Sequence, residues 1–371
     1  MAAATGCVPL CCHIRSAVSP VGKNVCSHRP TRSIAAFLPA TKRSKQVAGC
    51  SSLRLTSSGL FSPAPVSKAA QPLLARVSRG SPGAPRAMAA EAASGSDVEA
   101  FAKSDARRML HVVYRVGNLE ATKKFYTEAL GMQVTRERDI PEEKYTNCFL
   151  GYGPETSNFV VELTYNYGKD KYDIGSGFGH FGIAVEDVAK TVEKIKVLGG
   201  TVTREPGPVK GGRSIIAFVK DPDGYMFELI QRAGPIKEPF AQVMLRVGDM
   251  DRAIEFYEKA HGMKLLRKSD RPEQKYTIAM MGYGPEDEST VLELTYNYGV
   301  TEYTKGDAYG QIAIGTDDVY KTGEALRAAG AKITREAGPL PGLNTKIVAA
   351  LDPDGWKTVF VDNEDFLKEL E

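Results

Sequence analysis

A stretch of about 120 residues occurs twice in this chain, at a constant offset of 131 residues. The segment VVELTYNYG around Glu162 returns as VLELTYNYG around Glu293, and KDPDGYMFELI returns as LDPDGWKTVFV. Self-similarity at a fixed period indicates that one structural unit is used more than once. The chain is therefore expected to be a tandem duplication that forms two related domains, residues 105–232 and 237–362.

The two copies differ at positions whose side chains can bind metal ions. The equivalent pairs are His111 and Gln242, His180 and Gln311, Glu228 and Val359, and the unchanged Glu162 and Glu293. Packing gives no reason to hold two histidines and two glutamates at matching strand positions, whereas imidazole and carboxylate are common ligands of divalent cations. The first copy therefore carries a full set of candidate ligands and the second copy a depleted set.

Each copy contains a fainter repeat of its own. HVVYRV at His111 and HFGIAV at His180 begin its two halves, and a glutamate follows each histidine after 51 or 48 residues. Each half reads as an alternating strand, an amphipathic helix over 119–130 or 188–199, and two or three further strands. The pattern predicts an α+β fold of four βαβββ modules, paired into two domains with curved mixed sheets.

Smaller signals complete this organisation. DPDG at 221–224 and again at 352–355 predicts a tight turn before the last strand of a module. The stretch 232–240, with Pro235 and Pro239, is expected to join the two copies. Residues 363–371 are expected to form a short C-terminal helix.

The alternation of strand side chains predicts where the ligands point. His111 and Arg115 share one strand face, and apolar residues occupy the other face, which is expected to pack against helices. The polar faces would then line concave clefts, where converging carboxylates are costly unless a cation pairs them. The folded part has one further histidine, His261, which aligns with Leu130 at a helix end and is expected to be structural.

Charge and cysteine are concentrated at the beginning of the chain. No Asp or Glu precedes Glu91, while residues 1–90 hold 12 Lys and Arg and five of the six cysteines. Residues 1–88 read as a transit peptide that directs the chain to the chloroplast stroma. The remainder is acidic, with 36 basic and 45 acidic residues, which gives no support for a nucleic-acid partner.

The part after the leader suits a reducing compartment. Only Cys148 remains there, in an apolar strand-like run, so it is expected to be a core residue and to form no disulfide framework. No segment reaches the roughly 18 consecutive apolar residues of a membrane span.

Four segments together carry a family resemblance. HVVYRVGNLEATKKFYTEALGM, VVELTYNYG, GHFGIAVED and KDPDGYMFELIQ resemble glyoxalase I, the lactoylglutathione lyase of the vicinal-oxygen-chelate superfamily. The resemblance covers residues 107–230 and, more loosely, 240–361. The doubled arrangement with a leader resembles the plant-type, plastid-directed form.

The resemblance implies a lyase that converts the hemithioacetal of methylglyoxal and glutathione to S-lactoylglutathione, which detoxifies methylglyoxal. It implies one divalent cation, Zn²⁺ or Ni²⁺, as cofactor. The implied metal ligands are His111, Glu162, His180 and Glu228 in the first copy and Gln242 and Glu293 in the second. The implied substrate contacts are Arg115 with Asn166, Arg246 with Asn297, and His180.

The family also implies how two modules build one site. If the modules exchange between copies, Gln242, Glu293, His180 and Glu228 form a complete set, and His111, Glu162, Gln311 and Val359 form an incomplete one. If each copy closes on itself, the first copy is complete and the second is not. We favour the exchanged arrangement, because the lost ligands then all fall in one site. The fused chain is expected to be a monomer.

The implied reaction moves a proton from one carbon to its neighbour, with the cation polarising the substrate oxygens. Glu228 is the candidate base, and Glu293 is its counterpart as a ligand and second proton carrier. The competing hypotheses are another metalloenzyme on this scaffold, such as an epimerase or a dioxygenase, and a metal-free protein that sequesters a small molecule.

Overall fold

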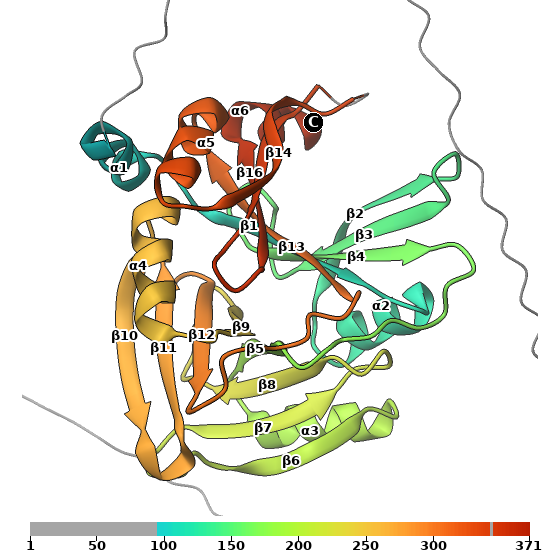
Figure 1. Cartoon of the computed structure of the whole chain (residues 1–371). Coiled ribbons are helices and arrows are strands. Elements are labelled where there is room, and N and C mark those ends of the chain that lie inside the picture. Colours follow the sequence, from blue (N-terminus) through green and yellow to red (C-terminus); the bar gives the residue numbers. More distant parts are fainter. Residues whose placement is uncertain (1–94, 342–343) are drawn as a thin grey trace, which may run out of the picture. The chain divides into compact units, whose positions relative to one another are not determined.

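The computed structural model describes residues 95–341 and 344–371, so the leader predicted at 1–88 lies outside the described residues. Within them the chain forms four βαβββ modules in sequence (Figure 1). We number them 1 to 4 in chain order, beginning with β1, β5, β9 and β13. This arrangement confirms the predicted α+β fold.

Modules 1 and 4 share one eight-stranded sheet, which we call the 1–4 sheet. In spatial order its strands are β14 (Lys332–Pro339), β15 (Lys346–Leu351), β16 (Lys357–Asp362), β13 (Tyr309–Thr316), β1 (Met109–Arg115), β4 (Val160–Asn166), β3 (Tyr145–Gly151) and β2 (Gln133–Ile140). The modules meet where β1 and β13 pair antiparallel. Within each module the first and last strands pair in parallel.

Modules 2 and 3 share the other sheet, the 2–3 sheet. In spatial order its strands are β10 (Lys264–Arg271), β11 (Tyr276–Gly282), β12 (Val291–Asn297), β9 (Phe240–Arg246), β5 (Phe178–Val185), β8 (Met226–Gln231), β7 (Ile215–Lys220) and β6 (Thr201–Pro208). The segment 232–240 therefore joins two modules of the same sheet. Each sheet takes one module from each copy, which is the exchanged arrangement.

Each module begins its helix with the same local device. The module helices are α2 (Leu119–Glu128), α3 (Val188–Val197), α4 (Met250–His261) and α5 (Val319–Ala328). The N-cap residues are Asn118, Asp187, Asp249 and Asp318, and each side chain accepts a hydrogen bond from the first helical turn. Outside the modules, α1 (Gly95–Ser104) precedes β1, α6 (Asn363–Glu369) follows β16, and a 3₁₀ turn spans Pro272–Gln274.

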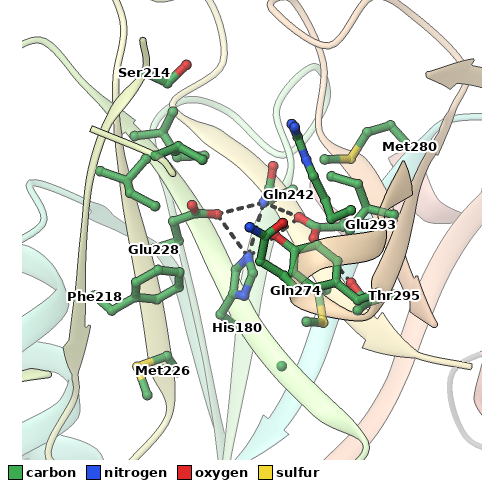
Figure 2. A pocket seen from close by; sticks show the side chains of 18 of the residues that line it. His180, Ser214, Phe218, Met226, Glu228, Gln242, Gln274, Met280, Glu293 and Thr295 are labelled. Atoms are coloured by element: carbon green, nitrogen blue, oxygen red, sulfur yellow. Dashed lines mark hydrogen bonds and ion pairs between the residues drawn. The ribbon is translucent and has the colours of Figure 1, made fainter. Parts of the chain in front are cut away.

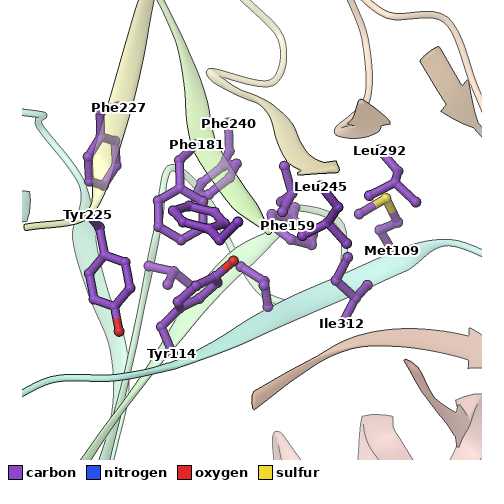
Figure 3. Close-up of a cluster of buried hydrophobic side chains, with 14 of the residues drawn as sticks. Met109, Tyr114, Phe159, Phe181, Tyr225, Phe227, Phe240, Leu245, Leu292 and Ile312 are labelled. Atoms are coloured by element: carbon purple, nitrogen blue, oxygen red, sulfur yellow. The ribbon is translucent and has the colours of Figure 1, made fainter. Parts of the chain in front are cut away.

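One large aromatic core lies between the two sheets (Figure 3). The ring of Tyr114 on β1 lies 4.7 Å from that of Phe181 on β5 and 5.0 Å from that of Tyr225 beside β8, measured between centroids. Since side chains alternate along a strand, burying Tyr114 turns His111 and Arg115 to the opposite face. The shared core thus fixes which face of each sheet is free to form a cleft.

Two expectations for single residues are confirmed. The Cys148 thiol is fully buried in the core. His261 is 1% exposed, and its ring packs 4.7 Å from that of Tyr257 and 5.0 Å from that of Phe360. Among the described residues, no helix combines the length and the apolar character that crossing a membrane requires.

Candidate metal centre

Four central strands of the 2–3 sheet bring together predicted ligands from both copies of the repeat. In the register of this sheet Gly182 on β5 lies opposite both Gln242 on β9 and Glu228 on β8. On β12 Glu293 lies beside Met244, two residues after Gln242. His180 shares the face of Gly182 because the two are separated by one residue.

These four side chains converge on one point (Figure 2). The His180 Nε2 atom lies 3.1 Å from Glu228 Oε2 and 3.6 Å from Glu293 Oε2. The ligand atoms of these three residues all lie within 4.8 Å of one another. In residues 95–341 and 344–371 no other group of three His, Cys, Asp or Glu side chains meets this geometry.

The amide of Gln242 occupies the centre of this group. Its Nε2 donates hydrogen bonds to Glu228 Oε2 at 3.1 Å and to Glu293 Oε2 at 2.5 Å, and lies 3.1 Å from His180 Nε2. The positive end of the amide dipole therefore balances two carboxylates, as a cation would. A bound cation would require the amide to turn and present its oxygen, which is the atom that can act as a ligand.

The protonation of His180 depends on the same carboxylates. Burial lowers the pKa of this imidazole, but hydrogen bonds and charge interactions with Glu228 and Glu293 outweigh burial and raise it to about 9. The group therefore holds a proton at neutral pH when no metal is present. One imidazole, two carboxylates and an amide oxygen form a donor set that suits a borderline divalent cation.

The centre lies on the wall of a cavity of about 650 Å³. Every strand of the 2–3 sheet contributes to its lining, which includes the predicted residues Arg246 and Asn297. The Arg246 Nη1 donates to the carbonyl oxygens of Ser176 and Phe178, at 2.9 and 2.8 Å, which fixes the guanidinium at the wall. An immobilised guanidinium is well suited to bind a carboxylate.

Several residues that line the cavity were not predicted from the sequence. They are Phe218, Met280, Arg204, Arg267 and Arg271. Phe218 and Met280 are apolar residues on strands and were indistinguishable from core residues, although the ring of Phe218 packs edge-on 5.6 Å from that of His180. A comparison of the two copies at the offset of 131 residues could have identified Phe218 and Met280. Their equivalents, Ala349 and Phe149, differ from them in size, as expected for unlike clefts.

Gly182 makes room for Gln242, which leads to a first prediction. A Cβ at position 182 would lie 2.2 Å from Gln242 Cγ, so Gly182→Ala is expected to displace the amide and lower metal affinity about 10–100-fold. Competition titration with a metal indicator measures the effect. The matched control is Gly207→Ala on β6, where a Cβ would meet no atom within 4 Å. Equal affinities for the two variants would show that the position of Gln242 is unimportant.

The equivalent positions of the 1–4 sheet form a weaker group. His111 Nε2 lies 3.4 Å from Glu162 Oε2, and Asn147 donates to Glu162 Oε1 at 2.6 Å. Burial lowers the pKa of His111 to about 3 and raises that of Glu162 to about 7, which favours the neutral pair. Val359 is 4% exposed and has no lone pair to offer a cation.

The structure therefore separates the four candidate ligands of the first copy. His111 and Glu162 lie on the 1–4 sheet, whereas His180 and Glu228 lie on the 2–3 sheet. The alternative in which the first copy closes on itself is wrong, because β1 pairs with β13 and β5 pairs with β9. Arg115 belongs to the 1–4 sheet, where it donates to the carbonyl oxygens of Asp307 and Tyr309.

Fold and site together define a class of protein: paired βαβββ modules in which one cleft holds a histidine, two carboxylates and an amide at metal-ligand spacing. The sequence model of the Glyoxalase/Bleomycin resistance protein/Dioxygenase superfamily matches residues 108–229 and 240–360. The chain belongs to this superfamily.

Individual relatives extend over most of the chain. A protein of Arabidopsis thaliana named probable lactoylglutathione lyase, chloroplastic, is 74% identical over 283 residues, which are 76% of this chain and 81% of the relative. The lactoylglutathione lyase of Oryza sativa subsp. japonica is 66% identical over 75% of this chain and 100% of its own length. The crystal structure of glyoxalase I from Zea mays is 68% identical and superposes with a TM-score of 0.72, covering 73% of this chain and 97% of that one.

Proposed function

We propose that this chain is a metal-dependent lactoylglutathione lyase, which converts the hemithioacetal of methylglyoxal and glutathione to S-lactoylglutathione. The observation that carries the proposal is the convergence of His180, Glu228, Gln242 and Glu293 on one point of a large cavity. The relatives that share most of this chain carry the name of that activity.

The cofactor in this proposal is one divalent cation, Zn²⁺ or Ni²⁺, held by His180, Glu228, Glu293 and the amide oxygen of Gln242. When bound, it polarises substrate oxygens and stabilises negative charge that develops on them. The donor set supports this assignment, because nitrogen and oxygen ligand atoms that lie within 4.8 Å of one another suit both ions.

The protein's own residues would then move the proton. Glu228 is the proposed base, because its Oε2 lies at the centre and the side chain faces the cavity. Glu293 stands on the opposite side of the same point, where it can act as a ligand and return a proton. The hydroxyl of Thr295 donates to its second oxygen, Oε1, at 3.3 Å and thereby helps to orient it.

The remaining lining residues would hold the glutathione part of the substrate. Arg246 and Asn297 are the proposed contacts for its polar groups, and both line the cavity. The amide of Asn297 is itself held by the hydroxyl of Tyr303 at 3.0 Å. Phe218 and Met280 are apolar residues of the lining and would help to exclude water from the bound substrate.

Further parts of the proposal concern the whole chain. We propose that residues 1–88 direct it to the chloroplast stroma, and the name of the Arabidopsis relative supports a plastid destination. We also propose a monomer, because the two modules that build the complete centre already lie in one polypeptide.

Metal removal tests the proposal directly. A chelator is expected to abolish turnover of the preformed hemithioacetal, and Zn²⁺ or Ni²⁺ is expected to restore it. Retained activity, or a requirement for iron without lyase activity, would favour a metal-free binding protein or another metalloenzyme of the superfamily.

Metal binding is also expected to depend on pH. An imidazole binds a metal only in its neutral form, but in the metal-free centre the carboxylates raise the pKa of His180 to about 9. Binding at pH 7 should therefore release about one proton from His180, and affinity should fall about tenfold per pH unit below pH 9. Titration in weakly buffered solution with a pH indicator measures the release. Metal binding that releases no proton would contradict this account of the centre.

A further inference from the structure

The C-terminal helix α6 packs on the 1–4 sheet, where it contacts β13 and β16 (Figure 1). Phe366 of α6 is 4% exposed. Its ring belongs to a buried cluster whose other members come from β1, β13, β15 and β16, namely Leu110, Ala313, Ile347, Ala349, Val359 and Val361. The cluster includes Val359, which stands where Glu228 stands in the other cleft.

The far end of α6 reaches the opposite edge of the same sheet. The carboxylate of Glu369 lies 3.4 Å from Arg138 Nη1 and 3.7 Å from Arg136 Nη1, both on β2. It also accepts a hydrogen bond from the hydroxyl of Thr345. Because α6 contacts β15 and β16 on one side and β2 on the other, it spans the face from module 4 to module 1.

Arg136 has a counterpart with a different neighbour. The equivalent residue in the 2–3 sheet is Arg267, which lines the substrate cavity. Both arginines form the same ion pair within their module, at 2.9 Å to Glu155 and 2.8 Å to Glu286. The guanidinium of Arg136 therefore faces Glu369, whereas that of Arg267 lines the cavity.

The residues beneath α6 also differ from their counterparts in a complementary way. Phe218 in the cavity corresponds to Ala349 under α6. The strand therefore lacks a ring at this position, and Phe366 of α6 supplies one instead. Ile230 is half-buried at the wall of the cavity, whereas its equivalent Val361 is 7% exposed. After β8 the chain continues into β9, so no helix follows at the equivalent position of the 2–3 sheet.

We propose that α6 acts as an internal ligand, which permanently occupies the cleft of the 1–4 sheet. We call this cleft, which carries His111, Glu162 and Val359, the 1–4 cleft. Phe366 fills the apolar part of a groove that would otherwise accept an amphipathic carboxylate, and Glu369 occupies its arginine pair. This contact closes the cleft to small molecules independently of the missing metal ligands. Restoring those ligands would therefore not be sufficient to create a second metal centre while α6 is docked.

Thiol labelling of the full chain tests the closure. Val361→Cys reports on the 1–4 cleft, and Ile230→Cys is the matched probe in the 2–3 cavity. Iodoacetamide labelling is followed at each position by peptide mass spectrometry, which separates the probe from the natural cysteines. We expect the thiol at position 361 to react roughly tenfold or more slowly than the thiol at 230, because it must wait for α6 to open.

Loosening α6 should remove the difference. Phe366→Ala with Glu369→Gln is expected to raise the labelling rate at 361 to near that at 230, and to leave the rate at 230 unchanged. Glu364→Gln, which removes only an exposed ion pair with Lys368, is the control and should change neither rate. Equal rates at 361 and 230 in the parent chain, or protection at 361 that persists after loosening, would overturn the proposal. Circular dichroism and thermal unfolding confirm that each variant is folded.

Metal content provides a second test. Gln311→His with Val359→Glu supplies the missing ligands, and we expect the nickel content after loading to remain one ion per chain. Adding Phe366→Ala and Glu369→Gln should raise it by one. A second ion without loosening would overturn the proposal. The metal test rests on the proposed function, but the labelling test does not. A parent chain that binds no metal would therefore refute the proposed function and leave the proposal for α6 to the labelling test.

Discussion

Glu293→Gln is expected to lower kcat by about 10²–10⁴-fold, whereas Glu162→Gln at the equivalent position should leave kcat nearly unchanged. The two glutamates occupy the same place in identical ELTYNYG segments. Only Glu293 lies within reach of His180 and Glu228. An amide at position 293 could still accept hydrogen bonds, but it would carry no charge for the cation and could not take up a proton.

The measurement is steady-state turnover of the preformed hemithioacetal, with metal content determined on the same samples. Thermal unfolding serves as the control, because both variants replace a buried carboxylate by its isostere and should have similar effects on stability. Loss of activity in Glu162→Gln together with retained activity in Glu293→Gln would place the working centre in the 1–4 cleft. That result would contradict the assignment based on the 2–3 sheet.

The order of strands and helices follows from local patterns, and this is why the sequence could predict it. The helices expected at 119–130 and 188–199 occur at Leu119–Glu128 and Val188–Val197. Gly131 and Gly199 follow them with φ of 76° and 79°, the left-handed conformation that ends a helix. Strand alternation placed the polar faces correctly for the same reason, since it depends only on neighbours along the chain.

Local patterns do not determine which modules pair with each other. Strands β1, β5, β9 and β13 hold equivalent positions in the repeat, so any two could meet and form similar hydrogen bonds. The sequence favoured exchange only through the distribution of Gln311 and Val359 between the two possible sites. The contact that decides the matter, Gly182 opposite Gln242, joins residues 60 positions apart and has no local signature.

The proposed role of α6 also could not be predicted from the sequence. A short C-terminal helix was predicted at 363–371 and occurs at Asn363–Glu369. Its acidic and apolar residues suit a surface helix equally well, and nothing local connects Glu369 with Arg138 on β2. Gln242 presents a similar case, because an amide on a strand does not reveal that its nitrogen will lie between two carboxylates.

Glu228→Gln separates the role of a base from the role of a ligand. Gln242 already contributes an amide to the centre, so a second amide should retain a bound cation while losing the ability to accept a proton. We expect metal content near that of the parent chain, a fall in kcat of about 10²–10⁴-fold, and little change in KM. The measurements are turnover under metal saturation and metal content after gel filtration.

The equivalent position supplies the control for this experiment. Val359→Ala should leave kcat unchanged, because that side chain lies in the cluster beneath α6 and not at the cavity. A Glu228→Gln variant that binds metal and retains kcat within about tenfold of the parent would exclude Glu228 as the base, since loss of a positioned base costs more than this. Glu293 is then the carboxylate left within reach of the same point, at 2.5 Å from the amide nitrogen of Gln242. The proton would have to leave from the opposite side of the centre.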